Sequence, residues 1–167
     1  DFINNNTNTE VKFVIAPHNI KASYVTSLKA QLKVKTICFS DLTDTDNLED
    51  YKVFILDTIG YLGKVYSYAD IAYVGGGAGT TGLHNILEPA VFEIPILIGE
   101  NYKNFPEAIR LIELGGVTSI SNSVVFNSKL NDLITDETSR NNQGKITKDY
   151  IDKNRGAVIK IMEYLES

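Results

Sequence analysis

Apolar and polar positions alternate in blocks along this chain of 167 residues. Short continuous apolar runs rich in β-branched side chains are typical of strands that are buried on both faces. Between them lie longer stretches in which apolar residues recur at helical spacing. Six strands are predicted, at 11–17, 34–39, 52–56, 71–76, 95–99 and 117–120. Helices are predicted around 20–32, 62–69, 85–92 and 105–116, and from two later apolar stripes, one at Phe126, Leu130, Leu133 and Ile134 and one at Ile151, Val158, Ile161, Met162 and Leu165.

Strands that alternate with helices predict an α/β fold, namely a Rossmann-like parallel sheet with helices on both faces. Ligands of such sheets bind at the carboxyl ends of the strands. Three segments are expected at this edge: the turn at Ala16 and Pro17, the segment 57–60, and the glycine-rich segment 74–82. They are the first candidates for a binding site.

Composition and charge exclude several classes of protein. The length and the 43% hydrophobic content fit one domain, which we expect over residues 11–167 after a polar linker at 1–10. The net charge is −5 and basic residues are not clustered, which argues against nucleic acid binding. Cys38 is the only cysteine, so no internal disulfide can form, and its apolar neighbours predict a buried, reduced thiol.

The chain gives no sign of a membrane span or a signal peptide. Every apolar run falls short of the roughly 20 residues that cross a bilayer, and the polar start lacks the apolar core of a signal peptide. We therefore expect a soluble domain. Because the chain begins with Asp1 rather than methionine, we also expect it to be a piece of a larger protein.

The glycine-rich segment invites comparison with dinucleotide-binding loops. Gly77, Gly79 and Gly82 match the G-x-G-x-x-G pattern, and Glu100 ends the next strand, where a ribose-binding acid is expected. Two features weaken this interpretation. Pro89 interrupts the following helix, and the fingerprint normally follows the first strand of a sheet, whereas this one follows the fourth. A phosphate-binding P-loop is excluded because no Gly-Lys-Ser or Gly-Lys-Thr triplet occurs.

The polar residues after the loop fit a nucleoside monophosphate better. A helix start approached by glycines such as Gly82 offers N–H groups to a phosphate or carboxylate. His84 and Asn85 can donate to the same anion, while Glu88 can accept from two ribose hydroxyls. Each residue alone also has a purely structural interpretation, as a turn glycine, a capping or core histidine, or a solvated glutamate. Their joint placement favours a site.

Two stretches, DTIGYLGKVYSYADIAYVGGG at 57–77 and GLHNILEPAVFEIPILIGENYKNFPEAIRLIELGG at 82–116, closely resemble the C-terminal domain of 3-deoxy-D-manno-octulosonic acid (Kdo) transferases. The resemblance implies the donor-binding half of a two-domain, GT-B type glycosyltransferase that moves Kdo from CMP-Kdo onto the lipid A precursor in lipopolysaccharide synthesis. It also implies that neither a metal nor another cofactor takes part. The acceptor site, a membrane anchor and the catalytic carboxylate are then expected in an N-terminal domain absent from this chain. The full-length protein is expected at the cytoplasmic face of the bacterial inner membrane.

The resemblance further assigns the CMP contacts, and the sequence departs from the family pattern at two of them. His18 stands where the family has arginine, a fixed two-pronged phosphate ligand, whereas histidine is only partly charged near neutral pH. Tyr61 replaces a glutamate, and its ring can either stack on the cytosine or pack within the protein. The glycine-rich loop also lacks the family's basic residue, which leaves the Kdo carboxylate to backbone groups and His84, or to the absent domain. The assigned contacts are Pro17, His18, Ile59, Gly60, Tyr61, Asn85, Ile86, Leu87 and Glu88.

Two alternatives stay open at this point. Another glycosyltransferase domain that binds a UDP-sugar shares the glycine loop and the ribose-binding glutamate. A non-catalytic module that binds a nucleotide or docks a partner is the second. We expect the chain by itself to bind CMP weakly and to catalyse no transfer.

Overall fold

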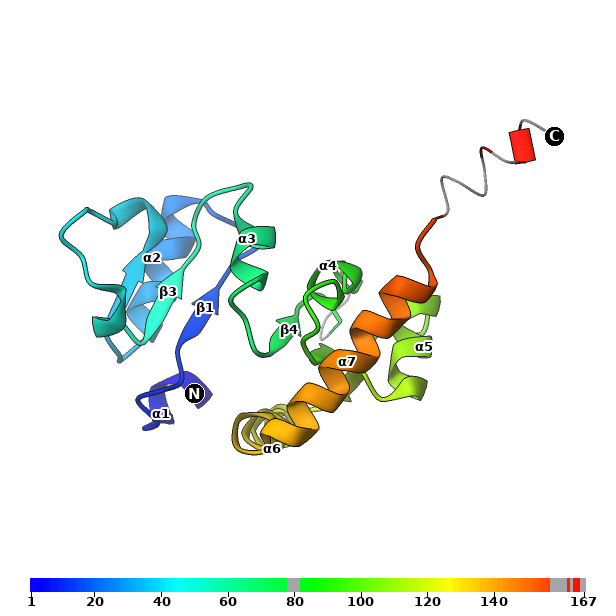
Figure 1. Ribbon diagram of the computed structural model, residues 1–167. Coiled ribbons are helices and arrows are strands. Elements are labelled where there is room, and N and C mark those ends of the chain that lie inside the picture. Colours follow the sequence, from blue (N-terminus) through cyan, green and yellow to red (C-terminus); the bar gives the residue numbers. More distant parts are fainter. Residues whose placement is uncertain (78–81, 157–161, 163, 166–167) are drawn as a thin grey trace. The chain divides into compact units, whose positions relative to one another are not determined.

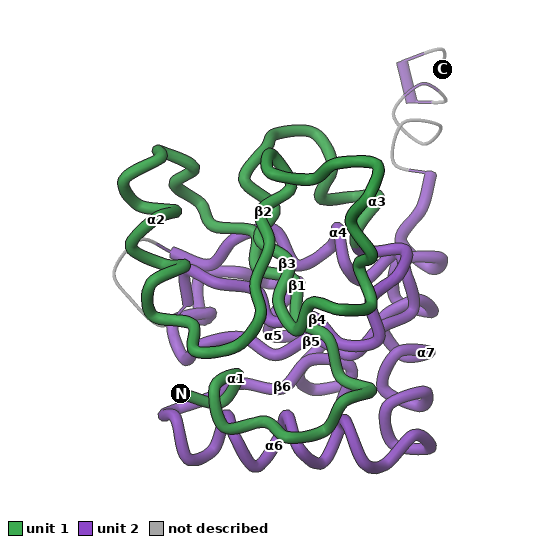
Figure 2. Tube along the Cα trace, turned by 90° about the vertical axis from the view of Figure 1, so that its left-hand side faces the viewer, with its two compact units in different colours: residues 1–65 green, residues 66–167 purple. Residues whose placement is uncertain are grey.

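The structure is a computed structural model that describes residues 1–77, 82–156, 162 and 164–165. It comprises two compact units, residues 1–65 and 66–167, shown in green and purple in Figure 2. Each unit contains its own three-stranded parallel sheet (Figure 1). All six predicted strands are present, and the predicted parallel α/β class is confirmed. The single domain predicted over residues 11–167 stays a prediction, because the two units are described separately.

Unit 1 is a parallel sheet in the order β1-β3-β2 with one long helix packed against it. The apolar face of α2 packs on the sheet through Val25, which is buried with Cys38, Val53 and Ile55. The predicted buried, reduced thiol of Cys38 is confirmed, and burial raises the pKa of this thiol. The elements are β1 (Phe13–Ile15), α2 (Ala22–Gln31), β2 (Thr36–Cys38), the 3₁₀ turns η1 (Phe39–Asp41) and η2 (Leu48–Asp50), and β3 (Val53–Ile55).

The first ten residues, predicted to be a linker, contain the helical turn α1 (Phe2–Asn5). The ring of Phe2 meets that of Phe13 edge-on, with centroids 6.1 Å apart. The side chain of Asn4 donates to the carbonyl of Gln31 at 2.9 Å and accepts from the amide of Lys33 at 2.8 Å. The apolar side chain of Phe2 is the sequence signal that a purely polar linker lacks.

Unit 2 is a parallel sheet in the order β4-β5-β6, with helices on both faces. Successive residues of β5 show this directly, because strand side chains point alternately to opposite faces. Ile96 and Ile98 are buried with Leu111 of α5, whereas Leu97 is buried with Leu133 of α6. The elements are β4 (Ala72–Val74), α4 (Leu87–Ala90), β5 (Ile96–Gly99), α5 (Pro106–Leu114), β6 (Val117–Ile120), α6 (Ser123–Thr135) and α7 (Glu137–Lys153), while α3 (Leu62–Tyr66) contains the division between the units.

The last long helix differs from its prediction. The stripe that begins at Ile151 predicted a helix continuing to Leu165, but α7 starts at Glu137 and ends at Lys153. Its sequence is mostly polar, so the apolar pattern misses its first four turns. The side chain of Asp136 caps it by accepting from the amide of Ser139 at 2.9 Å. Val158 and Ile161, which also belonged to the predicted stripe, lie outside the described residues.

Helix α7 nevertheless docks closely on unit 2 and contacts α4, α5 and α6. The buried hydroxyl of Thr147 donates to the carbonyl of Ile94 at 3.1 Å, immediately before β5. Across the part of the chain that the structure describes, no helix has the length and apolar character required to cross a membrane.

Candidate functional site

The predicted donor-binding residues fall into two groups, one in each unit. Unit 1 carries the group after β1 and β3, and unit 2 carries the group after β4. Because the units are described separately, each group is described by itself. The first group is Pro17, His18, Ile59, Gly60 and Tyr61, and the second is Gly82, His84, Asn85, Ile86, Leu87 and Glu88.

In unit 1 the two turns leave the sheet at the same edge. Strands β1 and β3 are parallel neighbours in register, with Ile15 opposite Ile55. The amide of Leu56 donates to the carbonyl of Ile15 at 2.8 Å and extends this pairing toward the carboxyl edge. Pro17 follows β1 half-buried and His18 follows it exposed. Within unit 1, this group therefore lies at the carboxyl edge of the sheet, where it was predicted.

The turn after β3 presents Ile59 and Tyr61 to the surface. Ile59 is 84% exposed, Tyr61 is 42% exposed, and Gly60 between them has a left-handed φ of 92°. The ring of Tyr61 packs on that of Phe39 with centroids 4.8 Å apart and a 40° tilt. Of the two roles that the sequence left open for Tyr61, packing is observed in unit 1, and the Nζ of Lys64 also lies over its ring, 5.6 Å from the centroid.

Two residues just before this turn were not among the predicted site residues. Asp57 accepts hydrogen bonds from the amide of Ser40 at 3.0 Å and from its hydroxyl at 2.5 Å, which ties the turn to the segment after β2. The hydroxyl oxygen of Thr58 is buried and has no hydrogen-bond partner among the described residues. Asp57 and Thr58 are the first two residues of the stretch 57–77 that resembles the Kdo transferases. This resemblance was the only indication in the sequence that they could belong to the site.

Acid should weaken the hydrogen bonds that Asp57 accepts from Ser40. Burial opposes ionisation of Asp57, but the hydrogen bonds from Ser40 outweigh it, so its pKa lies below the ordinary 3.8. A lowered folded-state pKa gives stabilisation that is complete above the unfolded-state value and lost as pH falls through the folded-state value. We expect the stability of unit 1 to fall below pH 3.8 more steeply in the natural chain than in Asp57→Asn. Urea titrations of both chains between neutral pH and strong acid test this, and parallel pH profiles would contradict it.

In unit 2 the glycine-rich loop returns to its own starting point. The amide of His84 donates to the carbonyl of Gly75 at 3.1 Å, so the chain after the loop pairs with the chain before it. A Cβ on Gly76 would lie 2.0 Å from the carbonyl oxygen of Gly82, so only glycine permits this approach. Residues 78–81, including Gly79 of the dinucleotide-type pattern, lie outside the described residues. The neighbouring glycines thus have a demonstrable structural role at the base of the loop.

Asn85 lies two residues before the short helix α4. Its side-chain oxygen accepts from the amide of Leu87 at 3.0 Å, and α4 is only four residues long, shorter than the predicted 85–92. The expectation that the helix start offers unpaired N–H groups is therefore wrong for Leu87. The side-chain NH₂ of Asn85 makes no hydrogen bond to the described residues and Asn85 is exposed, so this NH₂ is the donor available to a ligand. Ile86 is buried and Leu87 is partly buried against the same core, so a ligand could reach only their backbone, of which the Leu87 amide is already bonded to Asn85.

Glu88 has the features that a hydroxyl-binding acid needs. It is half-buried, and its carboxylate forms no ion pair and accepts no side-chain hydrogen bond within the described parts of the chain. Burial, and then the negative charge of Glu88, raise the pKa of Tyr66. Tyr66 in turn stacks on Phe92 with ring centroids 6.3 Å apart. Tyr66 was predicted only as part of a helix face, and no pattern in the sequence linked it to Glu88.

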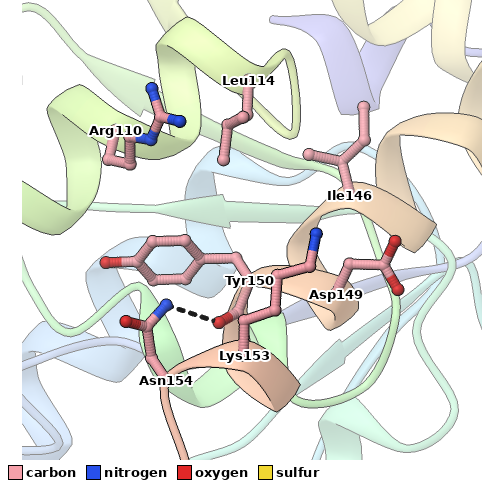
Figure 3. Close-up of a pocket in the computed structure, with 7 residues that line it drawn as sticks. All are labelled: Arg110, Leu114, Ile146, Asp149, Tyr150, Lys153 and Asn154. Atoms are coloured by element: carbon pink, nitrogen blue, oxygen red, sulfur yellow. Dashed lines mark hydrogen bonds between the residues drawn. The ribbon is translucent and has the colours of Figure 1, made fainter.

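Hollows on unit 2 do not coincide with the predicted residues. A hollow of about 460 Å³ lies between α5 and α7, with Arg110, Tyr150 and Lys153 in its lining (Figure 3). The side chain of Asn154 donates to the backbone carbonyl of Tyr150 there at 2.8 Å. A second hollow of about 420 Å³ lies at the carboxyl ends of β4, β5 and β6. Neither contains Asn85 or Glu88 in its lining.

A solved structure confirms the fold. No protein-family model matches the sequence. The C-terminal CMP-Kdo binding domain of WaaA from Acinetobacter baumannii is similar at a TM-score of 0.71 and 22% sequence identity, over 86% of this chain and 75% of that one. The fold is therefore the predicted parallel α/β fold, which this chain shares with that domain.

Several proteins of related sequence are named as Kdo transferases. The 3-deoxy-D-manno-octulosonic acid transferase of Haemophilus influenzae is 32% identical over 120 residues, which are 71% of this chain and 28% of that protein. The enzyme of the same name from Aquifex aeolicus is 28% identical over 131 residues, 77% of this chain and 35% of its own length. A bifunctional glycosyltransferase/methyltransferase of Fusobacterium nucleatum is 28% identical over 94 residues, 56% of this chain and 15% of that protein. The predicted resemblance to the Kdo transferases is confirmed, and the chain spans 28% of the length of the Haemophilus relative.

Proposed function

We propose that this chain is the donor-binding part of a Kdo transferase and that its ligand is CMP-Kdo. The names of the sequence relatives and the fold of the Acinetobacter domain support this proposal. The observation that carries it is the pair formed by Asn85 and Glu88. An exposed amide group and a half-buried carboxylate without an ion pair lie within four residues of each other, directly after the glycine-rich loop.

In this proposal each group of residues has a distinct task. The side-chain NH₂ of Asn85, with His84 and the amides of the Gly82 segment, donates to the phosphate or to the Kdo carboxylate, and Glu88 accepts from the ribose hydroxyls. When the bond between Kdo and the CMP phosphate breaks, the phosphate gains negative charge, so these donor hydrogen bonds strengthen in the transition state. Ile86 and Leu87 contribute backbone groups. The contacts proposed in unit 1 are Pro17, His18, Ile59, Gly60 and Tyr61.

Deprotonation of the acceptor is assigned to a part of the enzyme beyond this chain. We propose that an N-terminal domain supplies the catalytic carboxylate, binds the lipid A precursor and contacts the cytoplasmic face of the inner membrane. No metal or other cofactor has a role in this scheme. This chain alone then binds CMP and transfers nothing, so appreciable transfer by the chain alone contradicts the division of labour.

Replacing Glu88 by glutamine should weaken CMP binding about tenfold, because a charge-assisted hydrogen bond becomes a neutral one. The substitution keeps the size of the side chain, so the fold should be unaffected. Isothermal titration calorimetry with CMP measures the effect. Glu107→Gln is the matched control, since Glu107 is half-buried like Glu88 and lies on α5, outside both groups. An unchanged CMP affinity in Glu88→Gln would refute the ribose-binding role.

The Fusobacterium relative favours a second candidate function, the donor domain of a glycosyltransferase that uses another nucleotide sugar. Titrations of the natural chain with CMP, UMP and UDP separate the candidates. A preference for CMP supports CMP-Kdo, and a preference for UDP supports a UDP-sugar. A chain that binds none of the three nucleotides would instead favour a module that docks a partner.

A further inference from the structure

The hollow of about 420 Å³ in unit 2 lies where three strands end together. Gly77 follows β4, Glu100 and Asn101 follow β5, and Ser121 to Ser123 follow β6. The loops after β4 and β5 are held to each other, since the amide of Asn101 donates to the carbonyl of Gly77 at 2.9 Å. The carboxyl ends of parallel strands are where α/β sheets bind ligands. We name this feature the strand-end hollow.

One wall of the strand-end hollow is aromatic. Tyr73 is 48% exposed, although its neighbours Ala72 and Val74 in β4 are each 4% exposed. Its ring meets that of Phe126 edge-on, with centroids 5.4 Å apart and planes at 82°. Phe126 thus fixes the orientation of the tyrosine ring while leaving part of it uncovered. A fixed, partly exposed ring is a flat apolar surface with a polar tip.

Apart from Gly77 and Ile120, the remaining lining residues are polar, and none carries a positive charge. Asn122 is occupied, because its oxygen caps α6 and its NH₂ donates to the hydroxyl of Ser121 at 3.2 Å. Glu100 is exposed, and its carboxylate makes no hydrogen bond or ion pair with described residues. Ser123 is exposed and adds a hydroxyl. Among the described residues that line the hollow none is lysine, arginine or histidine.

This lining selects a chemical class of ligand. A phosphate or carboxylate would meet the unpaired charge of Glu100 without a compensating cation, so anions are disfavoured. A purely apolar ligand would bury that carboxylate without a hydrogen bond, which is also unfavourable. A polyhydroxylated ring satisfies the carboxylate and the serine hydroxyl with its own hydroxyls, and packs its C–H face on Tyr73. Pockets of this size and mixed lining hold small ligands.

We propose that the strand-end hollow is a binding subsite for an uncharged sugar ring. The subsite is separate from the proposed CMP contacts Asn85 and Glu88, which do not line it. Sugar binding in the strand-end hollow requires no nucleotide. The chain can therefore bind CMP without binding a sugar there, or bind the sugar without binding CMP.

Titration of the chain with methyl β-D-glucopyranoside, in the absence of nucleotide, tests the proposal by ¹H–¹⁵N NMR. A single small ring that uses one aromatic face should bind with a Kd of about 1 to 10 mM. Saturable shifts are expected at the amides of Gly77, Asn101 and Ser121. D-Glucuronate, the matched anionic probe, should bind at least about tenfold more weakly because of Glu100. An absence of saturable shifts, or equal binding of the two sugars, overturns the proposal.

Two variants identify the groups responsible. Tyr73→Ala should weaken binding of the methyl glucoside about tenfold or more, because it removes the aromatic wall. Glu100→Gln removes the negative charge that repels glucuronate, so it should raise the affinity for glucuronate toward that for the neutral sugar. Glu100 is exposed, so this substitution changes no packed residue. Unchanged discrimination between the two sugars in Glu100→Gln contradicts the assignment even if Tyr73→Ala fails to fold. Neither variant should alter the affinity for CMP.

Discussion

Replacing Gly144 by alanine is expected to lower the free energy of unfolding of unit 2 by about 2 to 3 kcal/mol. Helix propensity alone gives the opposite sign, since alanine is favoured over glycine by about 1 kcal/mol inside a helix. The contact decides, because a Cβ at Gly144 would lie 2.1 Å from the backbone oxygen of Glu93 and 3.3 Å from the Cα of Ile94. These are main-chain atoms that lead into β5, so they cannot rotate away as a side chain would. Helix α7 must shift, and the hydrogen bond from Thr147 to Ile94 is then lost.

Hydrogen exchange and chemical unfolding together measure this effect. Amides of α7 should lose protection in Gly144→Ala, and the unfolding midpoint of unit 2 should fall. Asn142→Ala is the matched control, because Asn142 is exposed in the same helix and alanine there should be neutral or slightly stabilising. A Gly144→Ala chain as stable as the control would show that α7 does not dock as described.

The same helix shows what an apolar pattern can and cannot predict. Strand β5 was predicted from the continuous apolar run at 95–99, because a strand covered on both faces needs such a run. Helix α7 needs few apolar residues, since it packs against the rest of unit 2 by close approach at Gly144 and by a hydrogen bond from Thr147. Close approach uses a residue with no side chain, which leaves no hydrophobic signal. The glycine within a polar helical stretch was the only trace of this contact in the sequence.

The positions of the candidate segments could be predicted where these segments follow strand ends. Parallel strands bring their following turns to one edge, so the turns at Pro17 and Ile59 could be placed from the strands alone. The side-chain partners of the site residues could not be predicted in this way. That the side chain of Asn85 accepts from the amide of Leu87, and that the charge of Glu88 raises the pKa of Tyr66, depend on side-chain directions that residue spacing does not fix. The place of this segment after β4 could therefore be predicted, but too many free amides were assigned to it.

Replacing Gly76 by valine is expected to weaken CMP binding more than about a hundredfold and to destabilise unit 2 by about 3 kcal/mol. Two independent penalties combine at this position. Its φ of 88° lies in the left-handed region, which a β-branched residue adopts only with strain. In addition, the Cβ would lie 2.0 Å from the carbonyl oxygen of Gly82. The chain after the loop must then move away from Gly75, which displaces the His84 amide and, with it, Asn85 and Glu88.

Gly156→Val separates the two penalties. Gly156 has a φ of 91°, yet no atom of the described residues lies within 4 Å of the position that its Cβ would take. This control therefore carries the backbone strain without the collision, and it lies outside the proposed binding residues. Calorimetry with CMP and thermal unfolding should show a modest loss of stability and unchanged affinity for Gly156→Val, against loss of both for Gly76→Val. If Gly76→Val binds CMP as tightly as the natural chain does, the glycine-supported return of the loop does not position the donor site, and binding must be sought in unit 1.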